Sequence, residues 1–306
     1  MKNYDNIGDD EIRLIVPKGE SKFDVFRKWW FWLTVAVCVS GIVWLIVWLR
    51  TNDAGQPEPD QSLPQSNVVT TVDNTSDFQC ESTAVLPNIV ENKSASVIIV
   101  DTTVNDVALR LYTPQNAIPE LCVGDVDTDD NSIIMAFQAA DIRADNHQVA
   151  GDFVVNGKVL SNGKAKRAFC AIIDGKTYIG CKEETPLLDE AIKRDGNFFR
   201  QYPLVVNGNM CENNPKGKAI RYALCEKDGV NMVVSSSARE SFYDFAQALA
   251  DFGMQQAIYL TGGNSYGFCR TESNPYISWG DASEWTKYAD GLNFIVWKSV
   301  KSNSQK

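Results

Sequence analysis

The fold of this chain depends on residues 237–270, which read SARESFYDFAQALADFGMQQAIYLTGGNSYGFCR. Ser237 and Glu240 have the spacing of a capping box, in which each side chain satisfies a backbone N–H at the start of a helix. We therefore expect a helix over residues 237–252, because its apolar residues recur at the i, i+3, i+4, i+7 spacing of one buried face. Gly253 can adopt the left-handed conformation that ends such a helix.

A glycine-rich loop follows this helix and one short strand. Residues 257–260 are apolar and predict a buried strand, and the loop after it reads Thr261, Gly262, Gly263, Asn264 and Ser265. Because the two glycines lack side chains, the backbone can approach a ligand and present N–H groups to an anion or a sugar hydroxyl. This loop is the best candidate site in the chain, and an ordinary tight turn is the alternative.

The order of helix, strand and glycine loop resembles the C-terminal signature of the phosphodiester glycosidase family. The family's loop typically reads Leu-Asp-Gly-Gly-Gly-Ser, so Thr261 stands here where the family has an acidic residue. The sequence QAADIR at residues 138–143 resembles the family's Asn-Gly-Gly-Phe block, with Asp141 in the place of the asparagine. The resemblance extends over roughly residues 95–300, and residues 198–208 and 221–225 resemble the two middle blocks.

This resemblance implies a hydrolase that cleaves the glycosidic bond of a sugar-1-phosphodiester. Asp141 and Asp152 are the carboxylates expected to act as base or nucleophile. Arg221 and Arg143 are expected to hold the substrate together with the loop residues Thr261 to Ser265, because a guanidinium offers two parallel hydrogen bonds to a phosphodiester. The expected partner is therefore a carbohydrate or sugar-phosphate ligand, and no cofactor is expected.

Two other functions stay open. A glycan-binding module could keep the scaffold without catalysis, and a structural envelope protein could depend on its tether and cysteines alone. The contacts of Asp141 separate the first two functions. If Asp141 takes over the role lost at Thr261, catalysis survives; if it pairs with Arg143 at the surface, binding without catalysis is favoured. His147, the only histidine, is more consistent with a solvated loop than with an acid or base.

Composition limits the fold and the partners. The 306 residues carry a formal charge of −10, which argues against nonspecific nucleic-acid binding because that depends on clustered Lys and Arg. The acidic turn at residues 125–130 lacks the glycine and glutamate of an EF-hand, so no metal is expected. Only residues 186–194 and 237–252 predict helices after residue 79, so we expect an α+β fold with a single mixed, mostly antiparallel sheet.

The N-terminal region predicts a membrane anchor. Residues 29–49 are 21 residues without a charge, enough to cross about 30 Å of hydrocarbon, although a cleavable signal peptide is the alternative. Basic residues precede this segment, so residues 1–28 should form a cytoplasmic tail. Residues 50–78 are rich in Pro, Ser, Asn and Asp and should form a flexible linker. Residues 79–306 should then form a periplasmic or extracellular ectodomain of unknown oligomeric state.

The cysteines suggest disulfides in that compartment. Eight cysteines are present, and one of them, Cys38, lies in the expected anchor. Cys170 and Cys181 flank a four-residue turn at residues 174–177 and would lie opposite each other in a hairpin, so we expect a bond between them. Cys211 and Cys225 flank a second turn and form the other expected bond. The alternative is that several of these thiols are buried and reduced.

Overall fold

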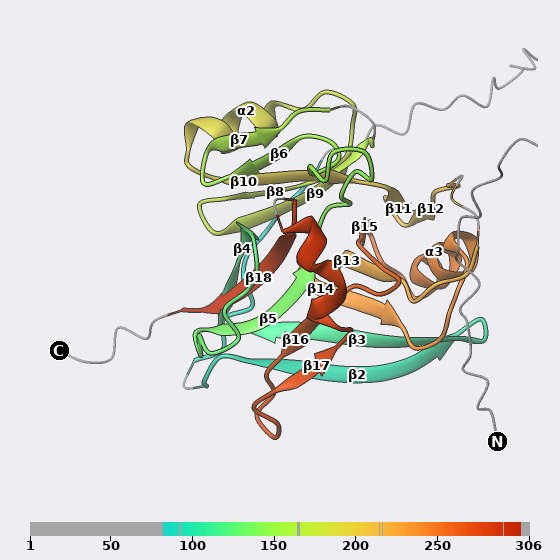
Figure 1. Cartoon of the computed structure of the whole chain (residues 1–306). Coiled ribbons are helices and arrows are strands. Elements are labelled where there is room, and N and C mark those ends of the chain that lie inside the picture. Colours follow the sequence, from blue (N-terminus) through green and yellow to red (C-terminus); the bar gives the residue numbers. More distant parts are fainter. Residues whose placement is uncertain are drawn as a thin grey trace, which may run out of the picture. The chain divides into compact units, whose positions relative to one another are not determined.

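The computed structural model describes residues 82–91, 93–163, 166–213, 215, 217–289 and 291–300. The strands in these residues form three sheets, and every pairing between them is antiparallel (Figure 1). The expected α+β class with mostly antiparallel strands and few helices is confirmed, whereas the expected single sheet is replaced by three. None of the described helices has the length and apolar character needed to cross a membrane. The anchor expected at residues 29–49 lies outside the described residues.

The first sheet has six strands and is covered by one helix. In spatial order its strands are β1 (Ala84–Val85), β9 (Lys176–Cys181), β8 (Ala168–Ile173), β10 (Asn197–Gln201), β6 (Phe153–Val155) and β7 (Lys158–Ser161). Helix α2 (Pro186–Lys193), capped by Thr185, packs Leu187, Ala191 and Ile192 against its outer face. The helix predicted at residues 186–194 is thereby confirmed.

The second sheet has seven strands and carries the other long helix. In spatial order its strands are β12 (Asn209–Met210), β11 (Pro203–Val206), β15 (Gln256–Leu260), β13 (Tyr222–Lys227), β14 (Val230–Ser236), β3 (Val107–Gln115) and β2 (Ser96–Val104). Helix α3 (Phe242–Asp251) buries Phe245, Ala246 and Leu249 against this sheet. The amphipathic helix expected from the sequence therefore packs against the sheet that contains the expected buried strand.

The start of α3 differs from the prediction. The extended chain of β14 runs up to Ser237, whose N–H donates to the Ala108 carbonyl, and Glu240 pairs with Ala219 in an isolated bridge. The helix is capped instead by Ser241, whose hydroxyl accepts the Asp244 N–H at 3.0 Å. The predicted capping box at Ser237 is wrong because backbone pairing with neighbouring strands takes the N–H groups that a helix start would have offered.

The third sheet has five strands. In spatial order they are β17 (Ile277–Trp279), β16 (Gly267–Cys269), β5 (Ile133–Gln138), β18 (Asn293–Ser299) and β4 (Ala117–Val123). A cluster that includes Phe268, Phe294 and Val296 covers one face, with Trp285 of the 3₁₀ helix η1 (Ala282–Tyr288) packed against it.

One buried core joins the three sheets. It contains Phe153 and Phe199 from the six-stranded sheet, Leu224 and Ile258 from the seven-stranded sheet, and Phe137 among those from the five-stranded sheet. Because apolar side chains from all three sheets leave water together, burial holds the sheets against one another.

Two-residue turns set the register of the hairpins. Both central residues have positive φ in five of them: Asn105–Asp106, Asn156–Gly157, Asp174–Gly175, Asn207–Gly208 and Asp228–Gly229. This conformation matches the twist of paired strands, and Asn-Gly and Asp-Gly sequences favour it.

The predicted disulfides are not formed, and hairpin register explains the first. The turn between β8 and β9 is the two-residue Asp174–Gly175 and not a four-residue loop, so Cys170 lies opposite Ile179 and not opposite Cys181. Cys170 is a free, fully buried thiol. Cys225 is likewise free, buried in the core beneath α3, whereas Cys211 packs in a separate cluster.

We predict that Cys170 and Cys225 resist alkylation in the folded protein. Burial raises the pKa of both thiols well above the ordinary range, so the reactive thiolate is scarce as well as inaccessible. Iodoacetamide should modify both only after denaturation, without prior reduction, as measured by peptide mass spectrometry. A peptide cross-linked through either cysteine would contradict this expectation.

Candidate functional site

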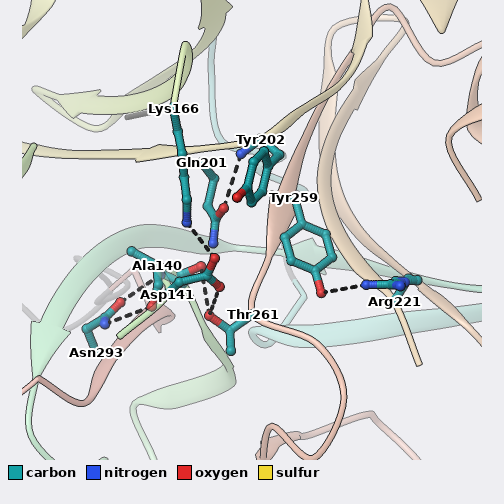
Figure 2. A network of polar contacts seen from close by, with 10 residues as sticks. Ala140, Asp141, Lys166, Gln201, Tyr202, Arg221, Tyr259, Thr261 and Asn293 are labelled. Atoms are coloured by element: carbon teal, nitrogen blue, oxygen red, sulfur yellow. Dashed lines mark hydrogen bonds and ion pairs between the residues drawn. The ribbon is translucent and has the colours of Figure 1, made fainter. Parts of the chain in front are cut away.

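Two loops that are distant in sequence meet at the ends of β5 and β15. The N–H of Thr261 donates to the carbonyl of Ala139 at 3.2 Å, and the Thr261 hydroxyl lies 3.4 Å from Asp141 Oδ1 (Figure 2). The two strands belong to different sheets, so this contact joins the five-stranded sheet to the seven-stranded one. Asp141 therefore faces the glycine loop, and one third of its side chain remains exposed.

A buried asparagine fixes the backbone that carries Asp141. Asn293, at the start of β18, accepts the Ala140 N–H at 2.8 Å and donates to the Ala140 carbonyl at 3.0 Å. Its side chain also donates to the Gly291 carbonyl. The amide of Asn293 thus holds both backbone polar groups of Ala140, the residue before Asp141, which restricts the direction in which Asp141 can point.

Lys166 is the direct ionic partner of Asp141. Its ammonium lies 2.5 Å from Asp141 Oδ2, with the lysine side chain only 5% exposed. The ammonium also lies 4.8 Å from the centre of the Tyr202 ring, a cation–π distance. Burial lowers the pKa of Lys166 below the ordinary lysine value, and the charge of Asp141 opposes that shift. The pair is therefore a partly desolvated carboxylate–ammonium contact.

Gln201 brings a second N–H donor to the same place. Its side chain is fully buried, and its Oε1 accepts the Tyr202 N–H at 3.1 Å, which fixes the orientation of the amide. Within the described residues, Gln201 Nε2 has no hydrogen-bond partner. Figure 2 shows this nitrogen directed toward the carboxylate of Asp141. A buried donor without a partner costs free energy, so this donor suggests a site for an acceptor that the protein itself does not supply.

All three sheets contribute to this site. Asp141 follows β5 of the five-stranded sheet, and Thr261 follows β15 of the seven-stranded sheet. Lys166 precedes β8, and Gln201 ends β10, both in the six-stranded sheet. The chain passes from that sheet into β11 directly after Gln201, at Tyr202. The site is therefore located where the sheets converge.

Arg221 lies next to this cluster but is engaged by the protein itself. Its Nε donates to the Glu240 carbonyl at 2.9 Å, and its Nη2 donates to the Gly217 carbonyl at 2.8 Å. Its Nη1 lies 3.4 Å from the hydroxyl of Tyr259, and Figure 2 shows the guanidinium on the far side of Tyr259 from Asp141. Since Arg221 is buried and three of its nitrogens have partners, its position favours bracing of Tyr259 over direct contact with a phosphate.

The glycine loop is shaped by close packing. A Cβ at Gly262 would lie 2.5 Å from the Tyr259 hydroxyl and 2.6 Å from the Ile220 carbonyl oxygen, so only glycine fits there. Gly263 has a φ of 68°, and its N–H donates to the Ile220 carbonyl. That N–H, expected to bind an anion, is therefore already used within the protein.

The rest of the loop contacts η1. The Asn264 side-chain amide donates to the Glu284 carboxylate at 3.1 Å, and the Asn264 backbone carbonyl accepts the Trp285 indole N–H at 2.9 Å. Ser265 is buried. These contacts hold the glycine loop against η1.

The other predicted residues have partners other than Asp141. Asp152 is paired with Arg200 at 2.6 Å and accepts the Gly163 N–H at 2.9 Å, so both carboxylate oxygens have partners. Arg143 pairs at the exposed surface with Asp145. His147 has a positive φ, and its ring packs edge-on against Tyr288.

Three members of this site were not predicted from the sequence: Lys166, Gln201 and Asn293. A lysine in a polar loop has the same pattern as any solvated lysine, so Lys166 gave no signal. Gln201 ends β10 and Asn293 begins β18, and a polar residue buried at a strand end is the feature that could have indicated them. In the described part of the chain, no group of three or more His, Cys, Asp or Glu side chains could hold a metal ion.

One family model matches more than half of the chain. The phosphodiester glycosidase family matches residues 131–288, which include Asp141, Lys166, Gln201 and Thr261. The solved catalytic domain of zebrafish N-acetylglucosamine-1-phosphodiester alpha-N-acetylglucosaminidase, auto-inhibited by its pro-peptide, is similar with a TM-score of 0.48 and 13% identity. That match covers 73% of this chain and 89% of the zebrafish chain.

A second solved structure, a hypothetical protein from Synechocystis, is similar with a TM-score of 0.41 and 13% identity. The match covers 66% of this chain and 62% of the Synechocystis chain. No curated protein sequence matches the chain significantly.

We predict that the Asp152–Arg200 pair stabilises the fold. The Arg200→Met variant should lose about 3–5 kcal/mol of unfolding free energy, because it leaves a largely buried carboxylate without its cation. Urea denaturation monitored by tryptophan fluorescence measures this loss. The exposed Arg110–Asp101 pair provides the matched control, and Arg110→Met should cost less than about 1 kcal/mol. Equal losses in the two variants would contradict a structural role for the buried pair.

Proposed function

Because the chain belongs to the phosphodiester glycosidase family, we propose that it is a hydrolase that cleaves the glycosidic bond of a sugar-1-phosphodiester. The observation that carries this proposal is the contact between Asp141 and Thr261. Thr261 stands where the resemblance places an acid, and Asp141 brings a carboxylate to the same point from the facing loop. Arg143 pairs with Asp145, so Asp141 is not held at the surface by the arginine that would have favoured a binding module.

In this proposal Asp141 acts as the general base. Asp141 takes a proton from a water molecule, the water oxygen bonds to the anomeric carbon, and the bond from that carbon to the phosphate oxygen breaks. The electron pair leaves with the phosphate. A phosphate is a good leaving group without protonation, so one carboxylate is sufficient for this step, whereas most glycosidases need two. Asp152 has a structural role in this proposal, since its carboxylate is paired with Arg200.

Other residues around Asp141 position it. Thr261 contacts the first carboxylate oxygen and Lys166 the second, while Asn293 holds the preceding peptide unit. Tyr259 lies between this group and Arg221, and Gly262 packs on the Tyr259 hydroxyl. A base whose backbone is held by Asn293 and whose Oδ1 contacts Thr261 loses little orientational freedom when the substrate binds, which favours reaction.

The location of the enzyme is also part of the proposal. Residues 29–49 would anchor the chain in a membrane as a single helix, with the N-terminus in the cytoplasm. Residues 50–78 would then tether residues 79–306 on the other side, where envelope or extracellular glycans are the expected substrates.

The test is a carboxylate exchange between the two facing loops. The full-length protein is incubated with a panel of sugar-1-phosphodiesters that includes UDP-N-acetylglucosamine, and the released sugar is quantified. Asp141→Asn should lower kcat at least about 100-fold, the usual contribution of a general base. The double variant Asp141→Asn with Thr261→Asp returns the carboxylate to the facing loop and should recover part of that loss.

Thermal unfolding of each variant shows whether it is folded. A folded Asp141→Asn variant with full activity would exclude Asp141 as the base. The alternative function, a glycan-binding module, is supported by the single carboxylate at the site and by its existing ion pair with Lys166. It predicts saturable binding of the same compounds without release of sugar.

A further inference from the structure

Two N–H donors are directed at the Asp141 carboxylate from the same side. The Lys166 ammonium reaches Oδ2 at 2.5 Å, and Gln201 Nε2 points toward the same group without a hydrogen-bond partner among the described residues. Lys166 and Gln201 are both buried, whereas Asp141 is one third exposed. The protein thus holds a positive charge and an unused amide donor behind a carboxylate that solvent can reach.

The arginines near the site have other partners. Arg143 is paired with Asp145, and Arg200 with Asp152 and with the carbonyls of Lys182 and Glu183. Arg221, as described above, donates to two backbone carbonyls. Among the described residues, Lys166 is therefore the cation whose contact with the site is a single side-chain ion pair. An ammonium has three donors on a flexible stem, so it can change its partner by a small rotation.

We propose that Lys166 and Gln201 form the phosphate-binding pocket of the site, in which Asp141 is the resting counter-ion that the substrate's phosphate replaces. The role in turnover rests on the proposed function, but the binding of a phosphate anion does not. A phosphate oxygen placed between the two donors accepts from both, which satisfies the buried amide and keeps the ammonium paired.

The exchange of partners also frees the base. While Lys166 is paired with Asp141, the ammonium occupies carboxylate oxygen Oδ2, and Thr261 contacts the other oxygen, Oδ1. When the ammonium turns to the phosphate, Oδ2 can accept a hydrogen bond from the attacking water. Binding of the anionic substrate would therefore prepare the base at the moment it is needed.

The test measures binding of inorganic phosphate to the full-length protein by isothermal titration calorimetry, at constant ionic strength and without any substrate. Lys166→Met should weaken binding at least about tenfold, because one charge-assisted hydrogen bond is lost. Gln201→Leu, which keeps the approximate size of the side chain, should weaken it about threefold or more. Asp141→Asn should instead tighten binding about threefold or more, because the competing negative charge is removed.

The opposite sign of the Asp141→Asn effect separates this inference from a merely structural role. Lys176→Met, an exposed lysine at the start of β9, is the matched control and should bind phosphate as the unmodified protein does. Absence of phosphate binding by the unmodified protein, unchanged binding by a folded Lys166→Met variant, or weaker binding by Asp141→Asn would each overturn the inference. If Lys166→Met does not fold, the Asp141→Asn and Gln201→Leu results decide.

The two proposals fail in different ways. If the binding pattern holds but no sugar is released from any phosphodiester, the phosphate pocket stands and the proposed hydrolase does not. If sugar is released but phosphate affinity does not depend on Lys166 and Gln201, the hydrolase stands and the pocket does not.

Discussion

The hydrogen bond from the Thr261 N–H to the Ala139 carbonyl connects the ends of two strands that belong to different sheets. It sets the distance between the loop after β5 and the loop after β15, and hence between Asp141 and Thr261. The core beneath it, with Phe137 and Ile258, keeps both strands in place. Because that core is shared by three sheets, the position of the carboxylate is determined by packing across the whole described domain and not by either loop alone.

Three carboxylates in and near the site are each paired with a basic side chain. The chain holds each of three acidic groups with its own cation: Asp141 with Lys166, Asp145 with Arg143, and Asp152 with Arg200. These pairs differ in burial and therefore in what they can do. The Arg143 pair is exposed and contributes little, the Arg200 pair is largely buried and braces the chain, and the Lys166 pair has one buried and one accessible partner. The last combination leaves a carboxylate that is oriented by a buried cation and can still be reached by solvent.

Much of the fold followed from local patterns. The apolar run before Thr261 predicted β15, and the α+β class followed from the scarcity of helical periodicity. Errors arose where the outcome depended on a partner distant in sequence. Ser237 and Glu240 have the spacing of a capping box, but their backbone N–H groups pair with other segments of the chain. The hairpin that contains Cys170 has a shorter turn than expected. The role of Lys166 could not be predicted for the same reason, since its partners Asp141 and Tyr202 are far from it in sequence.

The contact between Asp141 and Thr261 closes a separation of 120 residues. Folds dominated by such distant antiparallel pairings form slowly, because a long loop must be closed before the contact repays its entropy. The site can be completed only after the strands of all three sheets have associated, because its residues come from all three. Activity would then appear at the end of folding, as a sensitive reporter that the last sheets have docked.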